Sequence, residues 1–247
     1  MCSSDLAPTY GVPLTSATVT LDNFVEVLVR QPATIRALGN SALFSGAAAV
    51  LCCALALPCA YALTRVAPRW RAPAEALFEW PYAIPGIVLA VALILLFLRP
   101  LPIVGISLYG TAAIIILAYV ARFFALVLKP TLAAFDQLDR SVEEAAQLCG
   151  AGRLATLRHV VLPAVAPSLA SGAILAVLIA FNELTVSALL WSGRTQTLGV
   201  VMFGLEEAGL TSQAAAVSLI GLVVAAAAML AADRLHPLLP DGTLPWR

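Results

Sequence analysis

The segment Glu143-Glu144-Ala145-Ala146-Gln147-Leu148-Cys149-Gly150, followed by Val160-Val161-Leu162-Pro163, lies in a polar stretch between two long apolar ones. The polar stretch covers residues 136–163. Each neighbouring apolar run has about the 20 residues that an α-helix needs to cross the hydrocarbon of a bilayer. We therefore predict that residues 136–163 form a loop at a membrane surface, joining two membrane spans.

The composition is typical of a membrane protein. Hydrophobic residues make up 61% of the chain, charged residues make up 11%, and the mean hydropathy is +0.95. Five segments are long and apolar enough to be spans: 41–63, 79–98, 109–128, 167–190 and 213–232. These runs are too long for barrel strands, and lipid-exposed backbone must satisfy its own hydrogen bonds. We expect an all-α membrane protein with about five transmembrane helices.

The charges indicate an orientation in the membrane. The formal net charge is zero, and we expect no nucleic-acid partner. If the 136–163 loop is cytoplasmic, nine cationic residues lie on that side and four on the other, in agreement with the positive-inside rule. The nine are Arg65, Arg69, Arg71, Lys129, Arg140, Arg153, Arg158, Arg234 and Arg247, and the four are Arg30, Arg36, Arg99 and Arg194. We therefore expect the N-terminus outside and the C-terminus in the cytoplasm.

Within the polar loop, the spacing predicts a helix over residues 139–149. Gly150 is expected to end this helix with a left-handed cap. A second short helix over residues 153–161 is expected to end before Pro163, because a proline disfavours helix in the residue before it. Two short helices joined at a glycine would form a rigid elbow on which a partner could dock. The alternative is a solvated amphipathic loop lying on the membrane surface.

The pattern of Glu-Ala-Ala, three residues, Gly, nine residues, a β-branched aliphatic, one residue and then Leu-Pro resembles the EAA loop of binding-protein-dependent ABC importer permeases. Val160 stands where that family often has isoleucine. The resemblance implies a type I, MetI-like permease domain over residues 40–232 with the coupling loop at 136–163. It leaves an extracytoplasmic segment at 1–39 and a cytoplasmic tail at 233–247. The coupling residues that it implies are Glu143, Glu144, Ala145, Ala146, Gly150, Leu162 and Pro163.

The same resemblance implies that the motor is another polypeptide. The sequence has no Gly-x-x-x-x-Gly-Lys-Ser/Thr phosphate-binding loop, and Lys129 is its single lysine. ATP and Mg²⁺ are then expected on an ABC ATPase dimer, and this chain is expected to be a transport subunit, with no enzymatic activity and no cofactor of its own. The other implied partners are a second permease subunit, identical or homologous, and a periplasmic or lipid-anchored solute-binding protein. The expected location is the bacterial inner membrane.

Several short stretches resemble the branch of this family that imports ferric iron, with thiamine, phosphonate, sulfate and polyamine systems nearby. They are Asn40-Ser41, Pro85-Gly86, Tyr109-Gly110-Thr111 and Phe181-Asn182-Glu183-Leu184. The resemblance implies ferric iron or another small polar solute of these classes. Relatives in this branch commonly have a further span before the segment that begins near Leu21, so we expect a truncated start.

Two features inside the expected spans could carry function. Pro81, Pro85 and Gly86 indicate either a gating hinge or a packing kink. Glu183, with Asn182 and Thr185, indicates either a lining of the solute path or a structural interhelical hydrogen bond, with the carboxyl protonated or paired to Arg122. For the intramembrane Arg122 we expect a side chain that reaches to the inner interface.

Other function classes fit the sequence less well. The histidines, His159 and His236, lie outside the expected spans, so an intramembrane hydrolase is excluded, and no metal site is expected. A secondary transporter or channel remains the alternative function. Such proteins usually carry several intramembrane charges or paired broken helices, and the sequence shows one deep carboxylate and no internal repeat.

Overall fold

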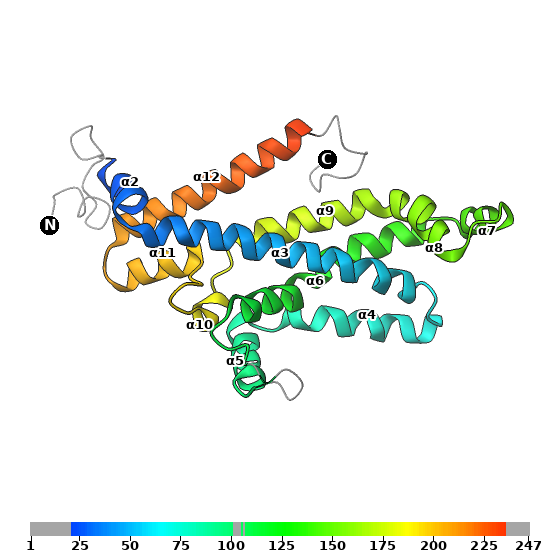
Figure 1. Ribbon diagram of the computed structural model, residues 1–247, viewed down its shortest axis with the longest axis horizontal. Helices are drawn as coiled ribbons and strands as arrows, with labels where there is room; N and C mark the ends of the chain where they lie inside the picture. Colours follow the sequence, from blue (N-terminus) through cyan, green and yellow to red (C-terminus); the bar gives the residue numbers. More distant parts are fainter. Residues whose placement is uncertain (1–20, 101–104, 106, 236–247) are drawn as a thin grey trace.

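The computed structural model describes residues 21–100, 105 and 107–235, and this part of the chain is built of helices (Figure 1). In chain order they are α2 (Asp22–Val25), the π-helix η1 (Glu26–Arg30), α3 (Pro32–Leu63), α4 (Pro68–Ala83), α5 (Gly86–Phe97), α6 (Ala112–Gln137), α7 (Arg140–Leu148), α8 (Arg153–Thr156), the π-helix η2 (Leu157–Val161), α9 (Leu162–Phe181), α10 (Ser187–Leu190), α11 (Leu198–Glu207) and α12 (Thr211–Leu235). The first 20 residues of the expected N-terminal segment, and residues 236–247 of the expected tail, lie outside the described part.

The core consists of α3, α6 and α9, which pack side by side along the long axis of the molecule (Figure 1). On α3 the buried positions 48, 52, 56 and 60 carry alanine or cysteine at four-residue spacing. Small residues at this spacing let helices approach closely in a membrane. On α9, a Cβ placed on Gly172 would lie 2.8 Å from the Cα of Val127 on α6, so that crossing requires glycine.

The expected fold class is confirmed. Four described helices are long and apolar enough to cross a membrane, and the number is five if α4 and α5 together form one span. The expected spans 41–63, 109–128 and 213–232 fall largely within the longer helices α3, α6 and α12. The expected boundary between residues 39 and 40 lies inside α3.

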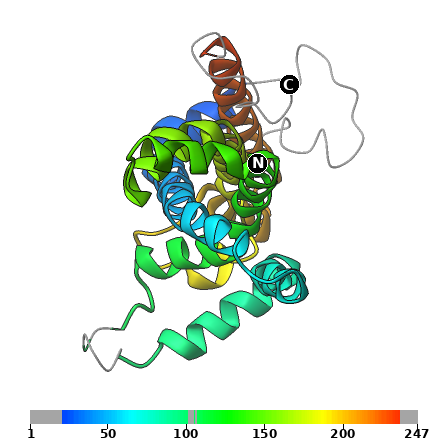
Figure 2. The same ribbon diagram turned by 90° about the vertical axis from the view of Figure 1, so that its right-hand side faces the viewer.

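The expected second span, 79–98, is wrong in its bounds and shape. Its place is taken by α4 and α5, which meet at 98°, and Figure 2 shows α5 leaving the bundle. The break is at Ile84, whose ψ of 135° is extended, because Pro85 follows it and disfavours helical geometry there. Pro81, expected to interrupt the same span, is accommodated inside α4.

Two predictions about α9 are also wrong. The expected span 167–190 is interrupted, because α9 ends at Phe181 and irregular backbone follows before α10. The expected helix end before Pro163 does not occur, since α8, η2 and α9 follow one another without a gap. Pro163 is in the first turn of α9, where a missing N–H costs little, and the wider π-turn of η2 precedes it.

The two ends of the molecule carry different elements. α7 and α8 project at one end of the long axis, and α2 and α11 lie at the other (Figure 1). α12 packs against α11 and α2, and its later turns diverge from the core helices (Figure 1).

Candidate functional site

The first candidate site is the protruding helix α7, which is capped at both ends. The side chain of Asp139 accepts a hydrogen bond from the backbone N–H of Ser141 at 2.9 Å. This bond holds the pKa of the Asp139 carboxyl below its ordinary value. At the other end Gly150 has a φ of +85°, and the N–H groups of Gly150 and Ala151 bond back to Gln147 and Ala146 at 2.9 and 3.0 Å. The predicted left-handed cap is confirmed, and it fixes the elbow after α7.

The two adjacent glutamates of α7 have different surroundings. The carboxylate of Glu143 accepts a hydrogen bond from Arg65, and its side chain is only 12% exposed. The same guanidinium donates to the hydroxyl of Tyr61 at 2.9 Å and lies over its ring at 4.8 Å. Glu144 is exposed. Glu143 therefore ties α7 to the connection between α3 and α4, while Glu144 faces solvent.

The other residues expected in the coupling loop are arranged around α7 and the start of α9. Ala145 is exposed beside Glu144, and Ala146 is half-buried. Leu162 is half-buried and Pro163 is exposed in the first turn of α9, directly after η2, which packs against α7. Leu148 is 90% exposed at the end of α7, a large apolar side chain that the sequence analysis did not single out. The open surface of α7 thus combines a carboxylate, a small residue and an apolar side chain.

The second candidate site lies between the core helices and the α4–α5 break, and it corrects the prediction for Arg122. Nε of Arg122 lies 3.7 Å from Oε2 of Glu183, and Nη1 donates to the carbonyl of Ile84 at 3.1 Å. Both charged side chains are largely shielded, at 18% and 10% exposed. The break at Pro85 leaves the Ile84 carbonyl without a helical partner. That acceptor and the carboxylate hold Arg122 in place, so it does not extend to the interface.

Glu183 is fixed by its own loop as well. Its Oε1 accepts a hydrogen bond from the backbone N–H of Val186 at 3.1 Å and another from the hydroxyl of Thr185. Asn182, expected beside them, is elsewhere: a Cβ on Gly221 would lie 3.3 Å from its Oδ1, so Asn182 faces α12. The structure brings Glu183 and Thr185 together and separates Asn182 from them.

The expected hinge and the expected polar residues meet at one place. A Cβ on Gly86 would collide with the hydroxyl of Thr185, and it would lie 2.9 Å from the Cβ of Thr185 and 3.0 Å from Nη1 of Arg122. Gly86 is buried for this reason. Only a glycine lets the first turn of α5 approach the loop after α9 so closely. Pro81 lies a turn earlier in α4 and takes no part in this contact.

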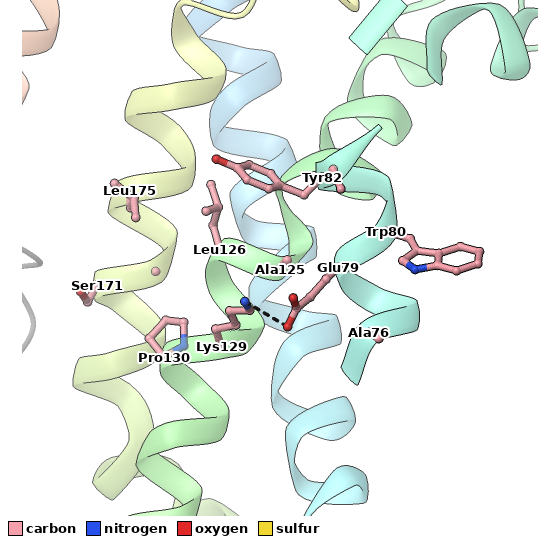
Figure 3. Close-up of a pocket in the computed structure, with 12 residues that line it drawn as sticks. Ala76, Glu79, Trp80, Tyr82, Ala125, Leu126, Lys129, Pro130, Ser171 and Leu175 are labelled. Carbon is pink, nitrogen blue, oxygen red and sulfur yellow. Dashed lines mark ion pairs between the residues drawn. The ribbon is translucent and has the colours of Figure 1, made fainter. Parts of the chain in front are cut away.

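A cavity of about 570 Å³ lies next to this region, between α4, α6 and α9 (Figure 3). Across it Nζ of Lys129 on α6 pairs with Oε1 of Glu79 on α4 at 3.0 Å. Tyr82, Trp80 and Ser171 also line it (Figure 3). The sequence analysis assigned no role to Glu79 or Lys129, although both lie in expected spans or directly at their ends.

Comparisons with known proteins agree with this architecture. Residues 32–242 match the family described as binding-protein-dependent transport system inner membrane component. The chain is 28% identical to the Fe(3+)-transport system permease protein FbpB 2 of Haemophilus influenzae over 169 residues. These residues are 68% of this chain and 33% of that protein. It is 31% identical over 239 residues to the trehalose/maltose transport system permease protein MalG of Thermococcus litoralis, covering 89% of this chain and 80% of that one.

Two solved structures share the fold. A bacterial ABC transporter involved in the import of alginate superposes with a TM-score of 0.71 at 18% identity, covering 96% of this chain and 88% of that one. The MetNI methionine ABC transporter superposes with a TM-score of 0.63 at 17% identity, covering 90% and 97%. At these identities the structures establish the fold alone. The family match over residues 32–242 establishes that this chain belongs to the inner membrane components of binding-protein-dependent transport systems.

Proposed function

We propose that this chain is the permease subunit of an ATP-driven ABC importer, which forms part of the solute path and couples it to a separate ATPase. The observation that carries the proposal is α7. It protrudes at one end of the bundle, it is capped at both ends, and it exposes Glu144, Ala145 and Leu148. A short rigid helix with an acidic, a small and an apolar residue on its open face suits docking into a groove of a soluble partner.

In this proposal the residues of the coupling loop have distinct roles. Glu144 pairs with a basic residue of the ATPase, Ala145 and Ala146 allow close approach, and Gly150 sets the elbow. Glu143 acts inside the chain through Arg65. Leu162 and Pro163 begin the long helix α9, which connects the docked loop to the membrane interior. ATP and Mg²⁺ bind to the ATPase dimer, since the sequence has no phosphate-binding loop.

The same proposal sets the orientation and the remaining partners. We place α7 in the cytoplasm and α2 and α11 outside, in agreement with the distribution of Lys and Arg along the sequence. A solute-binding protein then docks at the α11 end, and a second permease subunit, identical or homologous, completes the solute path. Glu183 and Thr185, held against the break at Pro85 and Gly86, line or gate that path, with Asn182 at its edge.

For the solute we propose a small polar compound delivered by a binding protein, with ferric iron as the first member to test. The likeness to an Fe(3+)-transport permease supports iron. The likeness to a trehalose/maltose permease is of similar strength and supports the broader class. Phosphonate, polyamine, thiamine and sulfate are the other members of the class.

The proposal is tested by purifying the tagged chain from gently solubilised membranes and identifying the proteins that accompany it. The wild-type chain is expected to recover a P-loop ATPase, and Glu144→Arg is expected to lose it while still inserting. Glu207→Arg is the matched control, because it reverses an exposed carboxylate on α11 at the other end of the molecule. If no ATPase accompanies the wild-type chain under several detergents, the docking role is wrong and a self-powered carrier is the better assignment.

A further inference from the structure

The helix α4 is attached to the bundle more loosely than its neighbours. None of its residues, all of which belong to the described part of the chain, is buried. It has a cavity on each side: one of about 570 Å³ toward α9, lined by Glu79, and one of about 320 Å³ toward α3, lined by Phe78. Its apolar contacts with α6 include that of Phe78, whose ring packs edge-on against Phe124 with 5.5 Å between the ring centroids. Little apolar surface therefore holds α4 in place.

Polar groups on α6 hold α4 instead. Arg122, Lys129 and Asp136 follow one another at intervals of seven residues. Seven residues are close to two helical turns, so all three side chains leave α6 on one face. We call these three residues the α6 polar stripe.

Each residue of the α6 polar stripe contacts α4 or the residue that follows it. At the start of α4, Asp136 pairs with Arg71. Two turns later Lys129 pairs with Glu79 at 3.0 Å. At the end Arg122 donates to the carbonyl of Ile84 at 3.1 Å. The contacts thus extend over the whole length of α4.

These contacts are suited to opening and closing. The side chains of Lys129 and Glu79 are 62% and 41% exposed, and those of Arg71 and Asp136 are 30% and 44% exposed. The cavity of about 570 Å³ that Glu79 and Lys129 line has room for water. An ion pair that water reaches contributes little net stability, because water replaces the partner when the pair separates. The Arg122 contact is better shielded, and it lies beside the break at Pro85, where a pivot would be.

We propose that α4 is a mobile helix that the α6 polar stripe holds closed, and that it swings about the Ile84–Pro85 break when the outer contacts of the stripe separate. The swing widens the 570 Å³ cavity between α4, α6 and α9. This inference deepens the proposed function by identifying a moving element of the permease. The start of α4 is linked through Asp136 to the end of α6, three residues before the Asp139 cap of α7. A docked ATPase could therefore release it from the α7 end.

The test measures the distance across the cavity in the full-length chain in lipid nanodiscs. Spin labels are placed on Ala76→Cys of α4 and Ser171→Cys of α9, which both line the cavity, after the five native cysteines are replaced by alanine. Lys129→Glu turns attraction to Glu79 into repulsion, so the distance distribution is expected to shift to longer values. The double variant Lys129→Glu/Glu79→Lys is expected to restore the distribution of the parent.

Further variants keep the test decisive. Glu207→Lys, an exposed charge reversal on α11, is expected to leave the distribution unchanged. If Lys129→Glu does not insert, Glu79→Lys applies the same comparison from the α4 side, with the same double variant as its swap. The inference is overturned if the single reversal leaves the inter-label distances of the parent unchanged. It is also overturned if the double variant gives distances as long as those of the single reversal. Because no ATPase is present, this result is independent of whether an ATPase co-purifies with the chain.

Discussion

Replacing Gly86 with alanine is expected to disturb the place where α5 meets the loop after α9. The added Cβ collides with the Thr185 hydroxyl and lies 2.9 Å from the Thr185 Cβ and 3.0 Å from Nη1 of Arg122. The guanidinium is the far end of a flexible side chain and can yield. Rotation of the Thr185 side chain relieves the collision with its hydroxyl but leaves its Cβ in place. The backbone around Thr185 must therefore move.

The cost of this shift follows from two contributions. Forcing an extra carbon into a well-packed site typically costs about 1–3 kcal/mol. Little is regained from helix propensity, because Gly86 is the first residue of α5, directly after its N-cap. For a chain of this size about 1 kcal/mol corresponds to roughly 2–4 °C in the unfolding midpoint, so we expect a fall of about 2–12 °C.

The assay is thermal unfolding of the purified chain in one detergent, with Gly46→Ala as the matched control. Gly46 is in α3, and a Cβ there meets nothing within 4 Å. Its replacement is expected to leave the midpoint unchanged or raise it, since glycine inside a helix costs about 0.5–1 kcal/mol relative to alanine. Thr185→Gly removes the two Thr185 atoms that the new Cβ meets and leaves Nη1 of Arg122, so adding it to Gly86→Ala is expected to recover part of the loss.

Two outcomes would refute the reasoning. The first is a Gly86→Ala midpoint equal to that of Gly46→Ala, which would mean that α5 does not pack against Thr185. The second is additivity of Gly86→Ala and Thr185→Gly, because residues in direct contact are expected to show a coupling energy of about 0.5–3 kcal/mol.

Three further predictions concern a helix crossing, a buried ion pair and a helix cap. Gly172→Ala pushes a Cβ against the α6 backbone, which cannot rotate away, and is expected to lower the unfolding midpoint by as much as Gly86→Ala. Arg122→Met leaves the Glu183 carboxylate without its countercharge and is expected to cost about 1–3 kcal/mol in thermal unfolding, whereas Arg122→Met/Glu183→Gln recovers most of it. The pKa of Asp139 lies below its unfolded value of 3.8, so its cap on α7 is fully present above that pH and is lost as pH falls through the folded pKa. The backbone N–H of Ser141 is expected to lose its protection from hydrogen exchange as the pH falls below 3.8. In Asp139→Asn this loss of protection is not expected, because the amide does not titrate.

The long helices and the capped elbow could be predicted from the sequence because each rests on a local signal. Apolar length predicted the spans later found in α3, α6 and α12. Gly150 predicted a left-handed residue, and its φ is +85°. Pro85 predicted a disturbance of the second span. Its local signal contains no information on the size of the bend, because the 98° angle depends on what α5 packs against.

The prediction for Arg122 failed because it depends on contacts between segments far apart in the chain, and the prediction for α9 failed because hydropathy averages over short polar stretches. Arg122 is 38 residues from the carbonyl that it binds and 61 from Glu183, and no periodicity connects these positions. The end of α9 at Phe181 is followed by the polar residues Asn182, Glu183 and Thr185, but apolar residues on both sides of them keep the mean hydropathy high, and the predicted span was therefore extended beyond it. The seven-residue spacing of Arg122, Lys129 and Asp136 was visible in the sequence, but its meaning required knowing that α4 lies along that face.

The contacts of Arg65 and Arg71 determine where a force on α7 goes. Arg65 binds Glu143 on α7 and is itself held by Tyr61 at the end of α3, while Arg71 binds Asp136 at the end of α6. Two cations six residues apart thus attach the start of α4 to both sides of the Asp139 cap. A displacement of the rigid α7 is therefore transmitted to the start of α4 as well as to α6 and α9, which it joins in sequence. Because the far end of α4 is held at Arg122 beside the break, a displacement that separates the Arg71–Asp136 pair leaves the start of α4 free to rotate about Ile84 and Pro85.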